Sequence, residues 1–351
     1  MENKKLHNIE FLRFVFAVII VYFHILHSSI MKYIGINFEY RILQKLSDNA
    51  GWIVECFFII SGYFLYKNII ENKDVSIAQF IWKKIIRLAP VLIFSVLLGV
   101  IFFKQSIYSA IFNSLFLQCI GLSLDYRGIN WYISPLFWTL IFYYAVFKNF
   151  NNKKAFVFVG VICYFCYLAN ISYCNGGFSR ATIWGIVNLG LARALAGIGL
   201  GVLIGKALDE FSNISLIVNK EIKLLMISII EISSFIFLAR YFLLGLKYKN
   251  AFIVVIVFSI CFINKNGILS KLLNCEMFSQ IGKYSYSIYV MQQISFWILQ
   301  KTLWQTEIIC STWLCLFVSL IVSVFMGVLT YYYIEQPFYK LLSKKMIFNK
   351  C

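Results

Sequence analysis

Long apolar runs alternate with short polar stretches along the whole chain of 351 residues. Each run is long enough to cross the roughly 30 Å hydrocarbon core of a membrane as a helix. No hydrophilic stretch between the runs is long enough for a soluble domain, which predicts a single domain over residues 1–351. The predicted fold class is all-α: a polytopic bundle of about ten transmembrane helices, over residues 9–30, 50–70, 88–104, 131–148, 154–172, 188–206, 222–245, 249–265, 278–300 and 310–334.

The distribution of positive charge predicts the topology of this bundle. If the N-terminus lies in the cytoplasm, 19 Lys and Arg residues fall on inner segments, nine on outer segments and four within the spans. Because cytoplasmic loops of membrane proteins accumulate Lys and Arg, this bias predicts that both termini are cytoplasmic. It also accounts for most of the net charge of +17 without a nucleic-acid partner.

A composition of 61% hydrophobic and 13% charged residues excludes a soluble globular protein. We expect a multi-pass protein of the inner (plasma) membrane, in contact with the lipid bilayer. The first apolar run has no small-residue cleavage site, so we interpret it as a retained helix. Cys163 and Cys166 form a CxxC pair without a second pair or a histidine at metal-ligand spacing, so no metal site is predicted.

The first predicted helix carries polar residues on one face. Arg13 and His24 are eleven residues apart, which places them on one stripe roughly 16 Å apart. Glu10 lies three residues before Arg13 and can pair with it. An intramembrane Arg costs roughly 2.5 kcal/mol or more, so such residues usually face a protein interior or a wet cavity. In the alternative interpretation, Glu10 and Arg13 reach the headgroups and His24 lies alone near the outer surface.

The second predicted helix contains Glu55 near its outer end and the pair Ser61-Gly62 in its middle. Glu55 is a second candidate for a buried acid, and the alternative is an interfacial carboxylate that faces water. Ser61-Gly62 by itself is a common small-residue contact between helices.

Charged residues also gather at predicted inner boundaries. Lys84 and Arg87 lie three apart on an amphipathic segment that enters the third helix at Pro90, and Glu335 closes the tenth helix. Lys84 and Arg87 can anchor the helix to anionic lipid or clamp a phosphate-bearing cytosolic ligand. Glu335 is either interfacial or a neighbour of these cations.

Two residues are candidates for acceptor binding. Trp131 opens the fourth helix, where aromatic residues usually form the interfacial belt but also stack on sugar faces. Arg193 lies near the outer end of the sixth helix, where it is either interfacial or able to bind an anionic acceptor. The apolar but polar-studded segment 105–130 is a candidate re-entrant or interfacial helix.

In their order along the chain, these motifs resemble the bacterial integral-membrane acyltransferases of acyltransferase family 3. The resemblance covers nearly the whole chain. The family motifs correspond here to Arg13 and His24 (Arg-x10-His), Phe57 to Tyr63 (FF-x-x-SG-[FY]), Lys84 to Pro90 ([RK]-x-x-R-x-x-P), Trp131-Tyr132, Arg193, Gly282 to Tyr289 (G-x-x-SY-x-x-Y) and Glu335 to Pro337 (E-x-P). Two positions depart from the family pattern. Lys84 replaces a commoner Arg, and Gln292 stands where many relatives have a second histidine.

The resemblance implies transfer of an acyl group, most often acetyl, from cytosolic acyl-CoA to a hydroxyl of an envelope glycan or lipid-linked sugar. Acetyl-CoA would then be a donor substrate, with no permanently bound cofactor. The implied roles are His24 as general base with Glu55 as its acid partner, and Arg13, Lys84, Arg87 and Glu335 as the acyl-CoA site. Trp131 and Arg193 would bind the acceptor, and Glu10, Ser61 and Gly62 would have structural roles.

Intramembrane Arg, His and Glu suit a proton-coupled glycan or metabolite transporter equally well. A structural subunit of a glycan-assembly machine is a third interpretation. Dependence on acyl-CoA separates the enzyme from a transporter, and a structural subunit would tolerate substitutions at Arg13 and His24. The sequence leaves open which acyl group and hydroxyl are used, whether transfer is direct or passes through an acyl-histidine, and whether the protein is a homo-oligomer.

Overall fold

A computed structural model describes residues 6–27, 51–72, 74–119, 130–173, 182–183, 187–213, 220–244, 248–264, 266–304 and 312–348. The regular structure in these ranges is helical, apart from one short antiparallel pairing of β1 (Thr182–Ile183) with β2 (Val187–Asn188). The chain divides into two compact units, each assembled from several separate segments.

Within the described ranges, seven helices are long and apolar enough to cross a membrane, which confirms the prediction of an all-α membrane bundle. They are α1 (His7–Leu26), α3 (Gly51–Glu71), α4 (Ile77–Phe103), α7 (Asn152–Tyr173), α8 (Leu189–Asn213), α9 (Lys220–Leu244) and α14 (Thr312–Thr330) with its continuation. The other three predicted spans contain the shorter helices α6 (Ile133–Asn149), α10 (Tyr248–Asn264) and α13 (Ser285–Leu299). The number ten and the side of the termini stay predictions.

Helix α4 is longer than the sequence predicted. It begins at Ile77, whereas the apolar run begins at 88, and it continues through Pro90. The amphipathic segment that carries Lys84 and Arg87 is therefore the first part of one continuous helix. Proline removes one hydrogen bond of that helix but does not end it here.

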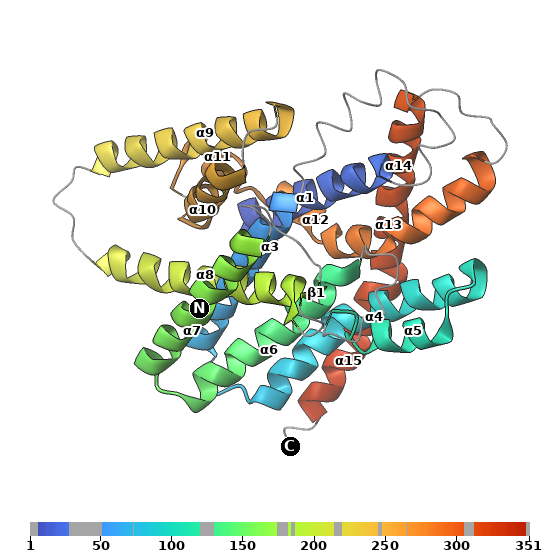
Figure 1. Cartoon of the computed structure of the whole chain (residues 1–351), viewed down its shortest axis with the longest axis horizontal. Helices are drawn as coiled ribbons and strands as arrows, with labels where there is room; N and C mark the ends of the chain where they lie inside the picture. The colour runs from blue at the N-terminus through green and yellow to red at the C-terminus, as the bar shows by residue number, and fades with distance from the viewer. Residues whose placement is uncertain are drawn as a thin grey trace. The chain divides into compact units, whose positions relative to one another are not determined.

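Unit 1 comprises residues 1–12, 51–77 and 132–282, and α8 is its central helix. Helices α3, α6 and α7 all pack against α8, and α10 packs against α3 and α9 (Figure 1). The contact of α3 with α8 is very close, because a Cβ atom on Gly62 would lie 2.9 Å from the Cα of Gly201. Glycines at both positions let the two backbones touch.

Unit 2 comprises residues 13–50, 78–131 and 283–351. Its described elements are most of α1 and α4, α5 (Ile107–Ser114), α13, η3 (Gln300–Trp304), α14, η4 (Tyr331–Glu335) and α15 (Gln336–Phe348). One core cluster joins α1 to α13 and α14 through Val21, Ile25, Ile288, Phe296 and Leu316. A second cluster joins α13 to α4 through Met291, Ile294 and Trp297, against Phe94 and Phe103. Helix α13 thus packs against both α1 and α4.

Candidate active site

The histidine of the first helix has a defined partner in unit 2. His24 Nδ1 lies 3.0 Å from Gln292 Oε1 on α13. The Gln292 amide is oriented by its own nitrogen, which donates to the Tyr289 carbonyl oxygen at 2.8 Å. Because Gln292 therefore presents its oxygen to the ring, His24 Nδ1 must carry the proton. In the neutral imidazole this leaves the lone pair on Nε2, which is the position that can act as a base.

A cluster of charges lies at the beginning of α1 and α13. Arg13 and Arg87 act electrostatically on Lys84, and the same two arginines act on the Glu335 carboxyl. Glu335 Oε2 accepts a hydrogen bond of 2.5 Å from the Ser287 hydroxyl. We call Arg13, Lys84, Arg87 and Glu335 the cation cluster, because three cationic residues act on one another and two of them also act on the carboxyl group.

The cation cluster and His24 belong to the same unit and lie along the same helices. On α1, Arg13 precedes His24 by eleven residues, or roughly 16 Å at 1.5 Å per residue. On α13, Ser287 beside Glu335 precedes Gln292 by five residues. Unit 2 therefore has cations at one end and an imidazole further along its axis. An extended ligand with anionic and reactive ends fits this order.

Glu55 and Arg193 form a buried ion pair in unit 1. The Arg193 Nε lies 2.9 Å from Glu55 Oε2, and the two side chains are 5% and 0% exposed. Tyr167 donates to Glu55 Oε1 at 2.5 Å, and Arg193 Nη2 donates to the Gly51 carbonyl oxygen. Gly197 leaves room for the carboxylate, because a Cβ atom there would lie 2.7 Å from Glu55 Oε1.

The ion pair connects Glu55 and Arg193, for which the sequence predicted two separate roles. Glu55 was expected to support His24, and Arg193 was expected to bind the acceptor. In the structure both carboxylate oxygens of Glu55 have partners within unit 1, and the His24 ring lies against Gln292 within unit 2. The catalytic role of Glu55 and the acceptor-binding role of Arg193 stay predictions. In either role, the residue would also be part of the ion pair that fixes the other side chain.

The remaining predicted residues are placed as follows. Trp131 is buried in the short turn η2 (Asn130–Tyr132) that precedes α6. Ser61 is partly exposed on α3, next to Gly62 at the contact with α8. Glu10 is partly exposed on α1, and its backbone lies against Gly282 at the end of α12 (Glu276–Gly282). Of the segment 105–130, the described part contains α5, and residues 120–129 lie outside the described ranges.

Glu231, a fully buried acid on α9, was not among the residues predicted from the sequence. Its carboxylate accepts hydrogen bonds from the backbone N–H of Leu269 at 2.8 Å and of Ser270 at 3.1 Å, and from the Ser270 hydroxyl. It thereby caps α11 (Ile268–Leu272). An acid in the middle of a predicted span was the available signal, because such residues are costly unless they have partners.

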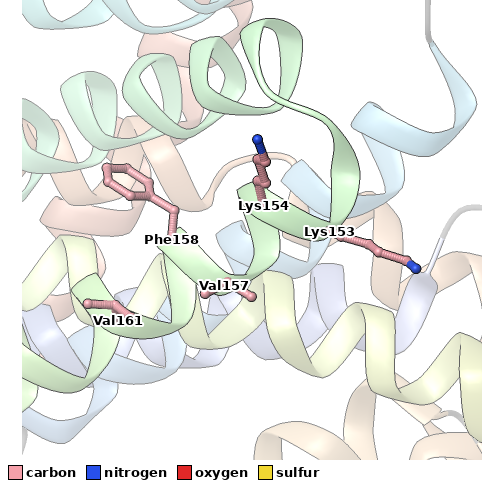
Figure 2. Close-up of a pocket in the computed structure, with 5 residues that line it drawn as sticks. All are labelled: Lys153, Lys154, Val157, Phe158 and Val161. Atoms are coloured by element: carbon pink, nitrogen blue, oxygen red, sulfur yellow. The ribbon is translucent and has the colours of Figure 1, made fainter.

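A shallow groove of about 450 Å³ runs along α7, lined by Lys153, Lys154, Val157, Phe158 and Val161 (Figure 2). None of these residues belongs to the predicted sites. The two lysines lie at the start of α7 and the apolar residues follow them, an order typical of a helix face that meets headgroups and then lipid tails. Among the described residues, no group of three His, Cys, Asp or Glu could hold a metal.

The apolar helices define a membrane protein. In its unit 2, the imidazole of His24 and the cation cluster lie at different heights along the same helices. A family model described as an acyltransferase domain, that of acyltransferase family 3, matches residues 6–333. The chain belongs to this family and is a membrane acyltransferase, which confirms the resemblance found in the sequence. No curated protein and no solved structure gives a significant match.

Proposed function

We propose that the protein transfers an acyl group, most often acetyl, from cytosolic acyl-CoA to a hydroxyl of a cell-envelope glycan at the inner membrane. The observation that carries this proposal is the hydrogen bond between His24 and Gln292, in the same unit as the cation cluster. A base oriented by a neutral amide suits deprotonation of a neutral hydroxyl.

In the proposed mechanism, Nε2 of His24 takes the proton of the acceptor hydroxyl as the oxygen attacks the thioester carbonyl. The tetrahedral intermediate collapses with cleavage of the C–S bond. The ester remains on the acceptor, and the CoA thiolate takes the proton back from the imidazolium. Gln292 Oε1 keeps its hydrogen bond from Nδ1–H throughout, so the ring does not turn.

The cation cluster is the proposed acyl-CoA site. The phosphates of CoA are anionic, and the forked guanidinium groups of Arg13 and Arg87 suit them. Lys84 adds an ammonium group, which lacks the planar two-donor fork of a guanidinium group. Glu335 would hold both arginines before the donor arrives, because its charge attracts them and Ser287 fixes its carboxylate.

Two routes for the acyl group use the same histidine. Direct transfer needs donor and acceptor bound together, whereas an acyl-histidine would form with the donor alone. The intact mass of the purified protein after incubation with acetyl-CoA separates the two routes, since only the second adds one acetyl group to the protein.

The test compares the wild type, His24→Ala, His27→Ala and cells without the protein, with surface glycans measured by mass spectrometry. Thiol release from acetyl-CoA is measured in the corresponding membranes. His27 is the matched control, because it directly follows α1, three residues after His24, is exposed, and lies 2.9 Å through Nδ1 from the Phe23 carbonyl oxygen. We expect an added acyl mass with the wild type and His27→Ala, and none with His24→Ala.

Normal acylation in the His24→Ala variant would refute the assignment of the base. Absence of thiol release from wild-type membranes that contain the protein and the cell's own glycans would refute the transferase. A glycan that crosses the membrane without acyl-CoA would then support the transporter.

A further inference from the structure

Gln105 is a buried amide without a hydrogen-bond partner. It lies between α4 and α5 in unit 2, its residue is 6% exposed, and neither Nε2 nor Oε1 has a partner within the described part of the chain. A buried amide normally forms hydrogen bonds, because its transfer from water is otherwise unfavourable. An unpartnered amide of this kind marks a place where a polar group belongs.

The position of Gln105 is fixed by its surroundings. Its backbone N–H donates to the Gly99 carbonyl oxygen at 3.1 Å, and the preceding Lys104 has a positive φ of 54°. A Cβ atom on Gly99 would collide with Gln105 Oε1 and lie 3.6 Å from Cζ3 of Trp297. The amide and the indole therefore meet over the bare backbone of Gly99.

This amide lies beyond the catalytic histidine, away from the cation cluster. Trp297 follows Gln292 by five residues on α13, a rise of roughly 7.5 Å. Ser287, beside Glu335, precedes Gln292 by the same number of residues. Along α13 the order is thus cation cluster, the partner of His24, and then the indole beside Gln105. A donor that enters from the cations and an acceptor at the amide would meet near His24.

Two further buried amides, those of Gln118 and Asn130, also contain polar atoms without partners. Gln118 Nε2 donates to the Asn130 carbonyl oxygen at 3.2 Å, which leaves Gln118 Oε1 and Asn130 Oδ1 buried and without partners in the described ranges. Trp131 follows directly. By contrast, Asn113 in α5 donates to Ser109 at both the backbone and the hydroxyl oxygen. Of these amides, Gln105 lies near the indole of Trp297, and Asn130 directly precedes Trp131.

We propose that Gln105, with Trp297, and the pair Gln118 and Asn130, with Trp131, bind the acceptor glycan. This inference rests on the proposed function. Amides supply both donors and acceptors to sugar hydroxyls, and indole rings stack on sugar faces. Because these amides and indole rings are neutral, they suit a neutral, hydroxyl-rich chain.

The test measures binding apart from chemistry. The full-length protein in lipid nanodiscs is titrated against a fluorescently labelled glycan fraction from the envelope of the cells that produce it. The Kd is read by anisotropy. Gln105→Leu keeps the size of the side chain and removes both amide atoms, so we expect a Kd about tenfold weaker from the loss of two hydrogen bonds. Thermal stability should be unchanged or higher, because no folded-state hydrogen bond is lost. Asn130→Leu should weaken binding in the same direction.

Asn113→Leu is the matched control, since it removes an equally buried amide whose partner is local, and its Kd should equal that of the wild type. Gly99→Ala displaces the Gln105 amide without removing it and should weaken binding as Gln105→Leu does.

A Gln105→Leu protein that binds glycan like the wild type would overturn the inference, and would mean that the amide holds only water. Absence of glycan binding by the wild type would overturn it as well. Glycan binding that requires Gln105, combined with no thiol release from acetyl-CoA, would leave the inference standing and refute the proposed function.

Discussion

Replacement of Glu55 by alanine is expected to destabilise unit 1 strongly. The variant leaves the Arg193 guanidinium, 5% exposed, without its carboxylate, and leaves the Tyr167 hydroxyl without its acceptor. Loss of one partner from a buried ion pair costs about 3–5 kcal/mol. For a unit of this size, such a loss lowers the midpoint of thermal unfolding by roughly 6–20 °C.

The assay is thermal unfolding of the purified protein in detergent, followed by circular dichroism. The pair of Lys67 and Asp209 on α3 and α8 is the matched control. Its atoms are 2.7 Å apart, but the side chains are 31% and 40% exposed. Lys67→Met should therefore cost no more than about 1 kcal/mol.

A combined variant, Glu55→Leu with Arg193→Met and Tyr167→Phe, removes the three polar side chains together and leaves the Gly51 carbonyl oxygen as the one group of this network that loses its donor. Buried pairs can often be replaced by apolar residues of similar volume at little cost, so this protein should be about as stable as the wild type. It then tests chemistry without a folding defect. Acyl transfer at the wild-type rate in this variant would show that Glu55 is not the acid partner of His24.

An equal and small effect of Glu55→Ala and Lys67→Met would refute the reasoning itself. It would mean that water reaches the buried pair in solution, contrary to the exposures in the structure.

Two further predictions concern packing and capping in unit 1. Gly62→Ala should destabilise by about 1–3 kcal/mol, because its Cβ would meet the backbone of α8, whereas Gly160→Ala should be neutral or slightly stabilising, since its Cβ would meet nothing within 4 Å. Thermal unfolding of the two variants checks this, and equal shifts would contradict it. Glu231→Ala should leave the backbone N–H groups of Leu269 and Ser270 without the carboxylate that accepts their hydrogen bonds, and it should lower the free energy of unfolding by about 1–3 kcal/mol. Hydrogen exchange should then accelerate at Leu269 and Ser270, and unchanged exchange there would show that another group caps α11.

The apolar runs were enough to predict the all-α membrane class, because the length and hydropathy of a run identify a candidate membrane-spanning helix. The start of α4 was predicted eleven residues too late. The segment 77–87 is amphipathic, and hydropathy does not distinguish an interfacial segment from the first turns of a longer helix. Its junction at Pro90 also looks like a boundary in sequence, although the structure continues through it.

The site was predictable where residues share a helix and unpredictable where they meet across the fold. The spacing of Arg13 and His24 follows from helix geometry. The partner of His24, however, is 268 positions away, and the partner of Arg193 is 138 positions away. A single sequence does not show which residues far apart along the chain come into contact. Glu55 could therefore be recognised as a buried acid, but its hydrogen bonds with Arg193 and Tyr167 could not be predicted. Gln105 gave no signal, because an amide becomes unusual only when its surroundings are known.

The turn η4, at Tyr331–Glu335, is a π-helical step between α14 and α15. A π-turn holds one residue more than an α-turn in nearly the same rise, so it shifts the angular phase of everything that follows. Deletion of one residue in this stretch would let the chain relax to an uninterrupted α-helix and rotate Glu335 by about 100° relative to α14. The carboxylate would then point away from Ser287 and from the two arginines. The charge balance at this end of unit 2 thus depends on a single surplus residue, and it is sensitive to chain length as well as to side-chain identity.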